Sequence, residues 1–196
     1  MKKIGRLADE LATYLRDRII SGEIAGGSTL AEATLAAEYD VARPTARAAI
    51  ELLALRGLVT RKPHLPAVVN SVPREDIPEI LSLLETTERL ALEQILMRDP
   101  DARPLRRALE SSTYFLLDEM VELSGSERLV QVHRRMTYEL ILAQLGGEAA
   151  FVDDAEARDA LVRAVLELDG AAASAALDHV QALRRAASVV SETVGQ

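Results

Sequence analysis

The first 69 residues contain three helix patterns separated by very short turns, followed by two short β-branched segments. Apolar residues recur every four positions from Leu7 to Ile19, which places them on one helical face. The patterns predict three helices, over 7–20, 31–39 and 43–55. The β-branched segments predict two strands, over 58–61 and 67–69, joined by a hairpin at 62–66. Residues 39–41 leave room only for a tight turn, so the second and third helices must lie close together.

The remainder of the chain has helical patterns only, after a linker at 70–76 that contains Pro73. The predicted helices cover 77–97, 102–123, 126–145, 151–168 and 170–194. We therefore expect a mainly α fold with two domains, 1–73 and 74–196. The first would be a winged helix-turn-helix and the second an all-helical bundle.

The net charge supports this division. The whole chain has a formal charge of −8, which by itself argues against a nucleic-acid partner. Residues 1–73, however, contain ten Lys and Arg against eight Asp and Glu, a net charge of +2, whereas residues 74–196 have a net charge of −10. The acidity therefore belongs to the second domain, and the first can still bind DNA.

Several classes of protein are excluded by composition and motifs. The chain has no cysteine, which removes disulfide scaffolds, thiol nucleophiles and cysteine-based metal sites. No apolar run approaches the ~18 residues of a membrane span, so we expect no membrane partner and a cytoplasmic location. No P-loop, GxGxxG, HExxH or Ser/His/Asp set is present, so we do not expect an enzyme.

The third predicted helix has the residues that a DNA-reading helix needs. Arg43 and Arg47 are four residues apart and project from one face, where a guanidinium can bind guanine or phosphate. Pro44 and Thr45 lie in the same first turn, and the hairpin adds Arg61, Lys62 and His64 near the flanking backbone. The alternative is that the two arginines are only a solvated helix face and that His64 is incidental.

Residues 7–69 resemble the DNA-binding domain of the GntR family of bacterial transcription regulators. The similarity rests on ordered stretches: 20–24, then Gly27 and Leu30, the second-helix pattern at 30–36, the third-helix pattern at 41–53, and 57–59 before the wing. The resemblance implies that Arg43 and Arg47 contact DNA. Three positions depart from the family pattern: Ala42 replaces a capping Ser or Thr, Ala33 a frequent arginine, and His64 a glycine.

Residues 75–196 resemble, more loosely, the all-helical effector domain of the FadR subfamily, called FCD. The resemblance rests on segment 89–93, on His133 with Met136, and on the alanine-rich run from Asp169 to His179. It implies an effector site that includes Arg89, His133 and His179. Many such domains hold a divalent metal through one aspartate and three histidines. Here Leu129 and Arg158 stand at two of those positions, so we expect no complete metal site.

Two functions remain open. In the first, a homodimer binds a palindromic double-stranded operator, and a small-molecule effector in the helical domain modulates that binding. Repression is the commoner outcome that the resemblance implies. In the second, the protein is a DNA-binding dimer whose degenerate helical domain no longer senses a ligand. On that alternative His133 and His179 are partly buried imidazoles with hydrogen-bond partners, and Arg89 is a surface arginine.

Overall fold

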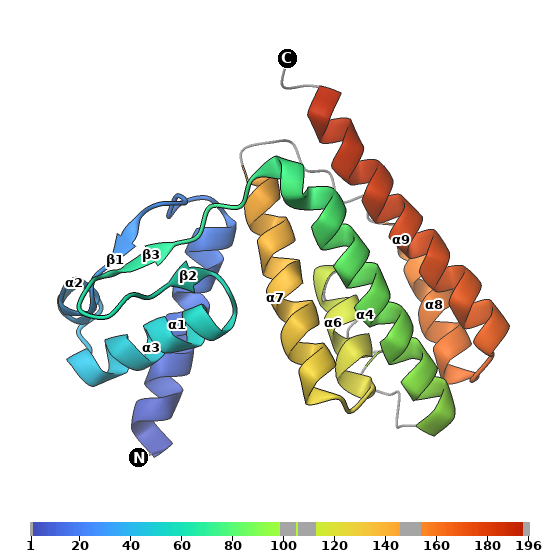
Figure 1. Cartoon of the computed structure of the whole chain (residues 1–196). Coiled ribbons are helices and arrows are strands. Elements are labelled where there is room, and N and C mark those ends of the chain that lie inside the picture. The colour runs from blue at the N-terminus through green and yellow to red at the C-terminus, as the bar shows by residue number, and fades with distance from the viewer. Residues whose placement is uncertain (1, 99–104, 106–112, 146–153, 194–196) are drawn as a thin grey trace. The chain divides into compact units, whose positions relative to one another are not determined.

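The computed structural model describes residues 2–98, 105, 113–145 and 154–193. The chain divides into two compact units (Figure 1): Met1–Asp76 with Tyr138–Gly146, and Ile77–Thr137 with Gly147–Gln196. The sequence placed one boundary after residue 73, whereas the long segment of the first unit ends at Asp76 and a second segment from the other half of the chain also belongs to that unit. Parts of the helices expected over 102–123 and 151–168, and the end of the one expected over 170–194, lie outside the described residues.

The first unit is a winged helix-turn-helix. Its elements are α1 (Lys2–Ile20), β1 (Thr29–Leu30), α2 (Glu32–Glu38), α3 (Arg43–Leu55), β2 (Val59–Thr60) and β3 (Ala67–Val69). The strands form an antiparallel sheet in the order β1-β3-β2, so the predicted hairpin is confirmed. The two-residue strand β1 was not predicted, because so short a segment gives no alternating pattern.

The three predicted helices of this unit are also confirmed, with one difference. The helix expected over 7–20 begins five residues earlier, at Lys2. The added turn has no apolar stripe, and only an Arg6–Glu10 ion pair at helical spacing marks it in the sequence. Periodicity alone therefore gave too late a start.

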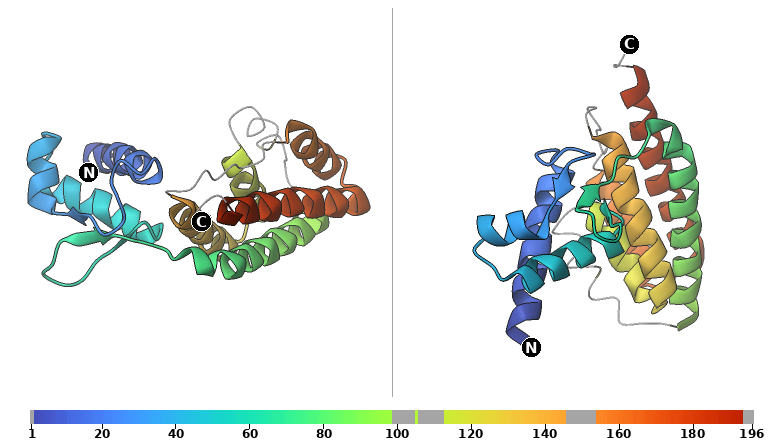
Figure 2. Two further views of the ribbon diagram at one scale, coloured as in Figure 1. Left: turned by 90° about the horizontal axis from the view of Figure 1, so that it is seen from above. Right: turned by 60° about the vertical axis from the view of Figure 1, so that its left-hand side comes forward.

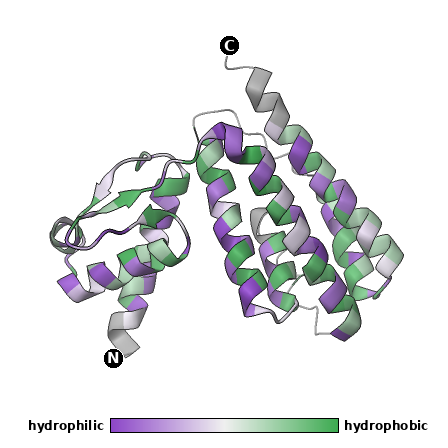
Figure 3. Ribbon diagram, in the orientation of Figure 1, coloured by the Kyte–Doolittle hydropathy of each residue, from purple (hydrophilic) through white to green (hydrophobic). Residues whose placement is uncertain are grey.

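The helices of the first unit surround one apolar core. α1 and α2 both pack against α3. The buried side chains come from every element and include Leu15, Ile19, Ile50, Leu53 and Leu58. Figure 3 shows hydrophobic and hydrophilic residues alternating along the helices, as this one-sided burial requires.

The second unit is built of helices. They are α4 (Ile77–Arg98), α6 (Thr113–Leu123), α7 (Glu127–Gln144, up to Thr137 in this unit), α8 (Ala155–Leu166) and α9 (Gly170–Thr193). α4 packs against α6 and α9, and α9 also packs along α8, as the two views of Figure 2 show. Their shared core includes Leu92, Ile95, Leu116, Leu161 and Leu177.

The fold class is thus mainly α, with a winged helix-turn-helix followed by a helical domain, as the sequence predicts. None of the described helices is both long and apolar enough to cross a membrane.

Candidate DNA-binding surface

The two faces of α3 have different roles. Ala46, Ala49, Ile50 and Leu53 are buried in the core of the first unit, which fixes the helix in place. Arg43 and Arg47 lie four residues apart, so their side chains leave the helix on one face. Both are exposed, so this face is not the one buried in the core.

The remaining predicted residues of α3 differ in exposure. Pro44 is exposed in the first turn, where its missing N–H costs no hydrogen bond. Thr45 is only 3% exposed, so its side chain supports the core rather than the surface. The residue before the helix, Ala42, makes no side-chain capping bond, as expected for alanine.

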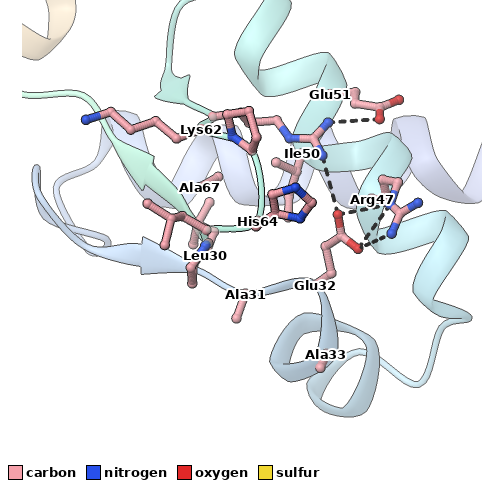
Figure 4. A pocket seen from close by; sticks show the side chains of 14 residues that line it. Leu30, Ala31, Glu32, Ala33, Arg47, Ile50, Glu51, Lys62, His64 and Ala67 are labelled. Atoms are coloured by element: carbon pink, nitrogen blue, oxygen red, sulfur yellow. Dashed lines mark hydrogen bonds and ion pairs between the residues drawn. The ribbon is translucent and has the colours of Figure 1, made fainter.

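The wing supplies the other predicted residues. Arg61, Lys62 and His64 all lie between β2 and β3, and Lys62 and His64 are exposed. His64 has a φ of 63°, in the left-handed region that favours glycine, which explains why a glycine suits this turn. Together with α2 and α3, the wing borders an open groove of about 740 Å³ (Figure 4).

An ion network crosses this groove. Arg47 Nε donates to Glu32 Oε1 at 3.0 Å and to Oε2 at 3.1 Å, and Arg47 Nη2 lies 3.0 Å from Oε2. Arg61 Nη2 lies 3.4 Å from Glu32 Oε1, and Arg61 Nη1 donates to Glu51 Oε1 at 2.8 Å. We call Glu32, Arg47, Glu51 and Arg61 the surface ion network (Figure 4).

The electrostatics follow from these contacts. The Arg47 guanidinium holds the pKa of Glu32 below its usual range, and Glu32 raises the pKa of Arg47. Glu32 and Arg47 are therefore both charged at neutral pH. Arg43, one turn before Arg47, has no ion-pair partner among the described residues. The surface thus combines one unpaired arginine with two that are held by carboxylates.

Glu32 and Glu51 were not among the residues singled out in the sequence. Glu51 lies four residues after Arg47 on α3, a spacing that the sequence does show. Glu32, however, is 15 residues from Arg47 and 29 from Arg61, and only the fold brings them together. No short-range signal could have found that contact.

The second unit contains a different ionic group, which we call the buried ion cluster: Glu88, Asp118, His133 and Arg184. Arg184 donates from Nη1 and Nη2 to the two oxygens of Glu88, at 2.6 and 2.9 Å. His133 Nε2 lies 3.1 Å from Glu88 Oε1, and its Nδ1 lies 2.8 Å from Asp118 Oδ1. The side chains come from α4, α6, α7 and α9, so the cluster ties four helices together.

The charge state of the cluster follows from its geometry. Both ring nitrogens of His133 face carboxylate oxygens, which accept but do not donate, so the ring must carry two protons. Burial disfavours that charge, but Asp118 and Glu88 outweigh it and raise the pKa of His133 to about 9. Burial likewise opposes ionisation of Glu88, yet Arg184 and His133 lower its pKa to about 2. Two cations therefore balance two anions in the interior.

The three residues assigned to an effector site lie in different surroundings. His133 is 2% exposed within the buried ion cluster, whereas His179 is exposed on α9. Arg89 is exposed on α4, where its Nη2 donates to Asp178 at 2.9 Å and to Gln181 at 3.3 Å. Gln181 in turn donates to Glu88 at 2.8 Å, which links Arg89, but not His179, to the cluster.

These residues do not fit the metal that the FCD resemblance implies. A histidine ligand needs one unprotonated ring nitrogen, and both nitrogens of His133 face carboxylates. Arg184 already supplies a cation to Glu88. No group of three or more His, Asp or Glu side chains arranged to hold a metal occurs in the described part of the chain.

Comparison with known proteins finds similarity within the first unit. Residues 7–69 match the model described as "Bacterial regulatory proteins, gntR family". The gluconate operon transcriptional repressor of Bacillus subtilis is 34% identical over 102 residues, which are 51% of this chain and 42% of the repressor. That of Bacillus licheniformis is 36% identical over 85 residues, 43% of this chain and 35% of the repressor. The matches thus span less than half of either repressor.

Solved structures agree with the fold over almost the whole chain. A structural-genomics GntR protein from Rhodococcus sp. RHA1 has a TM-score of 0.64 at 20% identity, covering 93% of this chain and 96% of that one. Escherichia coli McbR/YncC has a TM-score of 0.65 at 15% identity, covering 93% and 97%. The matched family is one of regulatory proteins, not of enzymes, in agreement with the sequence-based expectation. Residues 7–69 are thus similar to the DNA-binding part of the gntR family of bacterial regulatory proteins, and the match covers this segment alone.

Proposed function

We propose that the protein is a transcription regulator that binds double-stranded DNA through α3 and the wing. The observation that carries this proposal is the two-sided build of α3. Its apolar face is fixed in the core, while Arg43 and Arg47 project together from the exposed face. A major groove admits one such helix, and arginines on its first turns reach base edges or phosphates.

The wing contributes contacts beside the groove that α3 would enter. Arg61, Lys62 and His64 lie in the loop between β2 and β3, at the edge of the open groove that Arg47 also lines. Cationic side chains at this place bind the sugar-phosphate backbone, which fixes register without reading sequence. We therefore assign base reading to Arg43 and Arg47 and backbone contacts to the wing.

The experiment selects bound duplexes from random DNA and then measures the affinity of variants for the selected operator. Arg43→Ala and Arg47→Ala should each weaken operator binding by roughly 10- to 100-fold. Arg163→Ala removes one positive charge from an exposed position on α8 and serves as the matched control. Undiminished operator affinity in both α3 variants, with a normal circular dichroism spectrum, contradicts the assignment.

We further propose a homodimer, because one winged helix reads only half of an operator. Two copies would place their α3 helices in successive major grooves, so the selected sequences should contain two inverted half-sites about one helical turn apart. Sedimentation of the protein on the selected duplex, at two protein chains per duplex, supports the dimer. A single half-site bound by one chain contradicts it. Such a regulator would act in the cytoplasm, where it meets DNA.

For the second unit, the buried ion cluster favours the candidate in which the helical domain does not sense a metal-bound effector. Arg184 and His133 satisfy the carboxylates of Glu88 and Asp118 from within the chain. A melting-shift screen with divalent metals, carboxylates and amino acids separates the two candidates. Stabilisation by a ligand, lost in Arg89→Ala, supports a small-molecule effector and, with it, effector-controlled repression. No shift with any of them supports a structural domain.

A further inference from the structure

Glu32 lies among basic side chains, on the very surface that has to approach DNA phosphates. It is the first residue of α2, and its side chain is 29% exposed. Its carboxylate is ionised, because Arg47 holds its pKa below the usual range. A fixed negative charge here opposes the phosphate backbone, so its presence needs a compensating role.

The geometry of the Arg47–Glu32 contact shows what that role is. Both oxygens of Glu32 accept from Nε of Arg47, and Arg47 Nη2 lies 3.0 Å from Glu32 Oε2, so the carboxylate lies along the inner edge of the guanidinium. Both Nη1 hydrogens and the second Nη2 hydrogen remain for another acceptor. Those are the donors at the outer end of the group, and guanine offers O6 and N7 as a matching pair of acceptors.

The pairing also acts before DNA is bound. A free arginine side chain loses rotamer entropy when it is fixed. Arg47 is 61% exposed and would otherwise sample many rotamers, but Glu32 restricts it in the unbound protein. Preorganisation of this kind improves binding to the matching partner without adding a contact.

A second contact extends the effect to the wing. Glu32 also faces Arg61, at 3.4 Å, so one carboxylate holds both a side chain of α3 and one that follows β2. Glu51, on α3, also pairs with Arg61 but makes neither a hydrogen bond nor an ion pair with Arg47. Glu51 therefore provides a natural control, because it has the same charge in the same surface ion network without the contact to α3's arginine.

We propose that Glu32 is a positioning residue for sequence discrimination. It presents Arg47 to the base edges and, through its charge, weakens binding to DNA of arbitrary sequence. This inference rests on the proposed DNA-binding function. Both effects act in one direction, since they raise the ratio of operator affinity to non-specific affinity.

Three variants of the full chain separate position from charge. Glu32→Asp keeps the charge but shortens the reach, so operator affinity should fall about tenfold while non-specific affinity stays unchanged. Glu32→Gln removes the charge and one acceptor, so non-specific affinity should rise and operator affinity should fall. Glu51→Gln should raise both affinities by a similar factor and leave their ratio within twofold of the wild type. Binding is measured against the selected operator and a scrambled duplex, at several salt concentrations.

The outcomes are distinguishable from failure of the proposed function. If the wild-type protein prefers no duplex over any other, the DNA-reading function itself fails. If the wild type has an operator preference and both Glu32 variants keep that preference within twofold, Glu32 is only a surface charge and this inference is overturned. Circular dichroism of each variant confirms that the compared proteins are folded, which is expected because Glu32 lies at the surface.

Discussion

The surface ion network of the first unit and the buried ion cluster of the second contain the same kinds of groups in opposite surroundings. In the first, Arg47 is 61% exposed and Glu32 is 29% exposed. In the second, Glu88 is fully buried and Arg184 is 6% exposed. Both contain an arginine held by both oxygens of a carboxylate, so the difference lies in the solvent and not in the pairing.

This difference sets what each group can do. Exposed ion pairs add little to the free energy of unfolding, because water screens them and already solvates the separated ions. Arg47 can therefore bind a base or phosphate through its remaining donors at small cost. In the interior, removal of one partner leaves the other as an unpaired charge that water cannot solvate, so separating Arg184 from Glu88 costs much free energy. The first arrangement suits recognition, and the second suits a fixed scaffold.

The most severe test of this comparison removes the buried cation. Arg184→Met leaves Glu88 with His133 as its one remaining cation, and should destabilise the second unit by about 3–5 kcal/mol. Urea unfolding followed by circular dichroism measures the loss. Hydrogen exchange of peptides from α4 and α9 shows whether the loss lies in the second unit.

The neighbouring arginine is the control for that variant. Arg185 is half exposed and pairs with Glu85 on α4, so Arg185→Met should change the free energy of unfolding by less than about 0.5 kcal/mol. Equal effects of the two variants would mean that burial does not distinguish these ion pairs. Arg47→Met extends the test to the first unit and should resemble the exposed control.

The pH dependence of stability gives a second, smaller effect. The pKa of His133 is about 9 in the folded protein and near 6.5 when unfolded, so its protonated form stabilises the fold fully below pH 6.5. That contribution is lost as the pH rises through 9, up to about 3 kcal/mol. Glu88 acts in the acidic range. Its lowered pKa stabilises the fold above pH 4.5, and this contribution is lost as the pH falls towards 2. Melting temperatures should therefore decline between pH 6.5 and 9.

Two histidine variants assign that decline to a residue. His133→Gln removes the titrating ring that faces Glu88, Asp118 and, across Glu88, Arg184, so the slope above pH 6.5 should become shallower. His179→Gln removes an exposed ring on α9 and should leave the slope unchanged. A slope that responds to His179 instead would place the titrating group outside the buried ion cluster.

The two ionic groups also show which parts of the fold and of the candidate sites could be predicted from the sequence. Periodicity predicted α3 and its exposed arginines, because every residue involved lies within 13 positions. It could not predict that Glu32 meets Arg47, or that Glu88 meets Arg184 across 96 positions, because these contacts depend on tertiary packing. The effector set was assigned by resemblance, and the structure gives His133 and His179 different surroundings, which no local pattern encodes.

The ends of α3 and α8 provide a third comparison, with effects near 1 kcal/mol. Both helices end with the same pair of backbone bonds, made by the N–H groups of Gly57 and Leu58 in one and of Leu168 and Asp169 in the other. The residue in the left-handed region is Gly57 (φ 76°) in α3 but Leu168 (φ 53°) in α8. Gly57→Ala should cost about 1–2 kcal/mol, and Leu168→Gly should add roughly 0.5–1 kcal/mol. Urea unfolding measures both, and changes of the same sign would contradict the shared motif.

The starts of the same two helices lead to the smallest predicted effect. Asp154 accepts a hydrogen bond from the Ala157 N–H at the start of α8, whereas Ala42 at the start of α3 offers no such acceptor. Ala42→Ser would supply an oxygen for the Thr45 N–H, which now reaches only the Ala42 carbonyl, and should stabilise the first unit by about 0.5–1 kcal/mol. Asp154→Ala is the reverse change and should destabilise the second unit by a similar amount. Hydrogen exchange in the first turn of each helix reports the two changes separately.

If Ala42→Ser slowed exchange in α3 without altering operator affinity, the first turn of the recognition helix would already be ordered before it meets DNA. A gain in operator affinity together with the slower exchange would show that DNA binding has to order that turn. Ordering the first turn before binding would then raise operator affinity, as we propose for the fixing of Arg47.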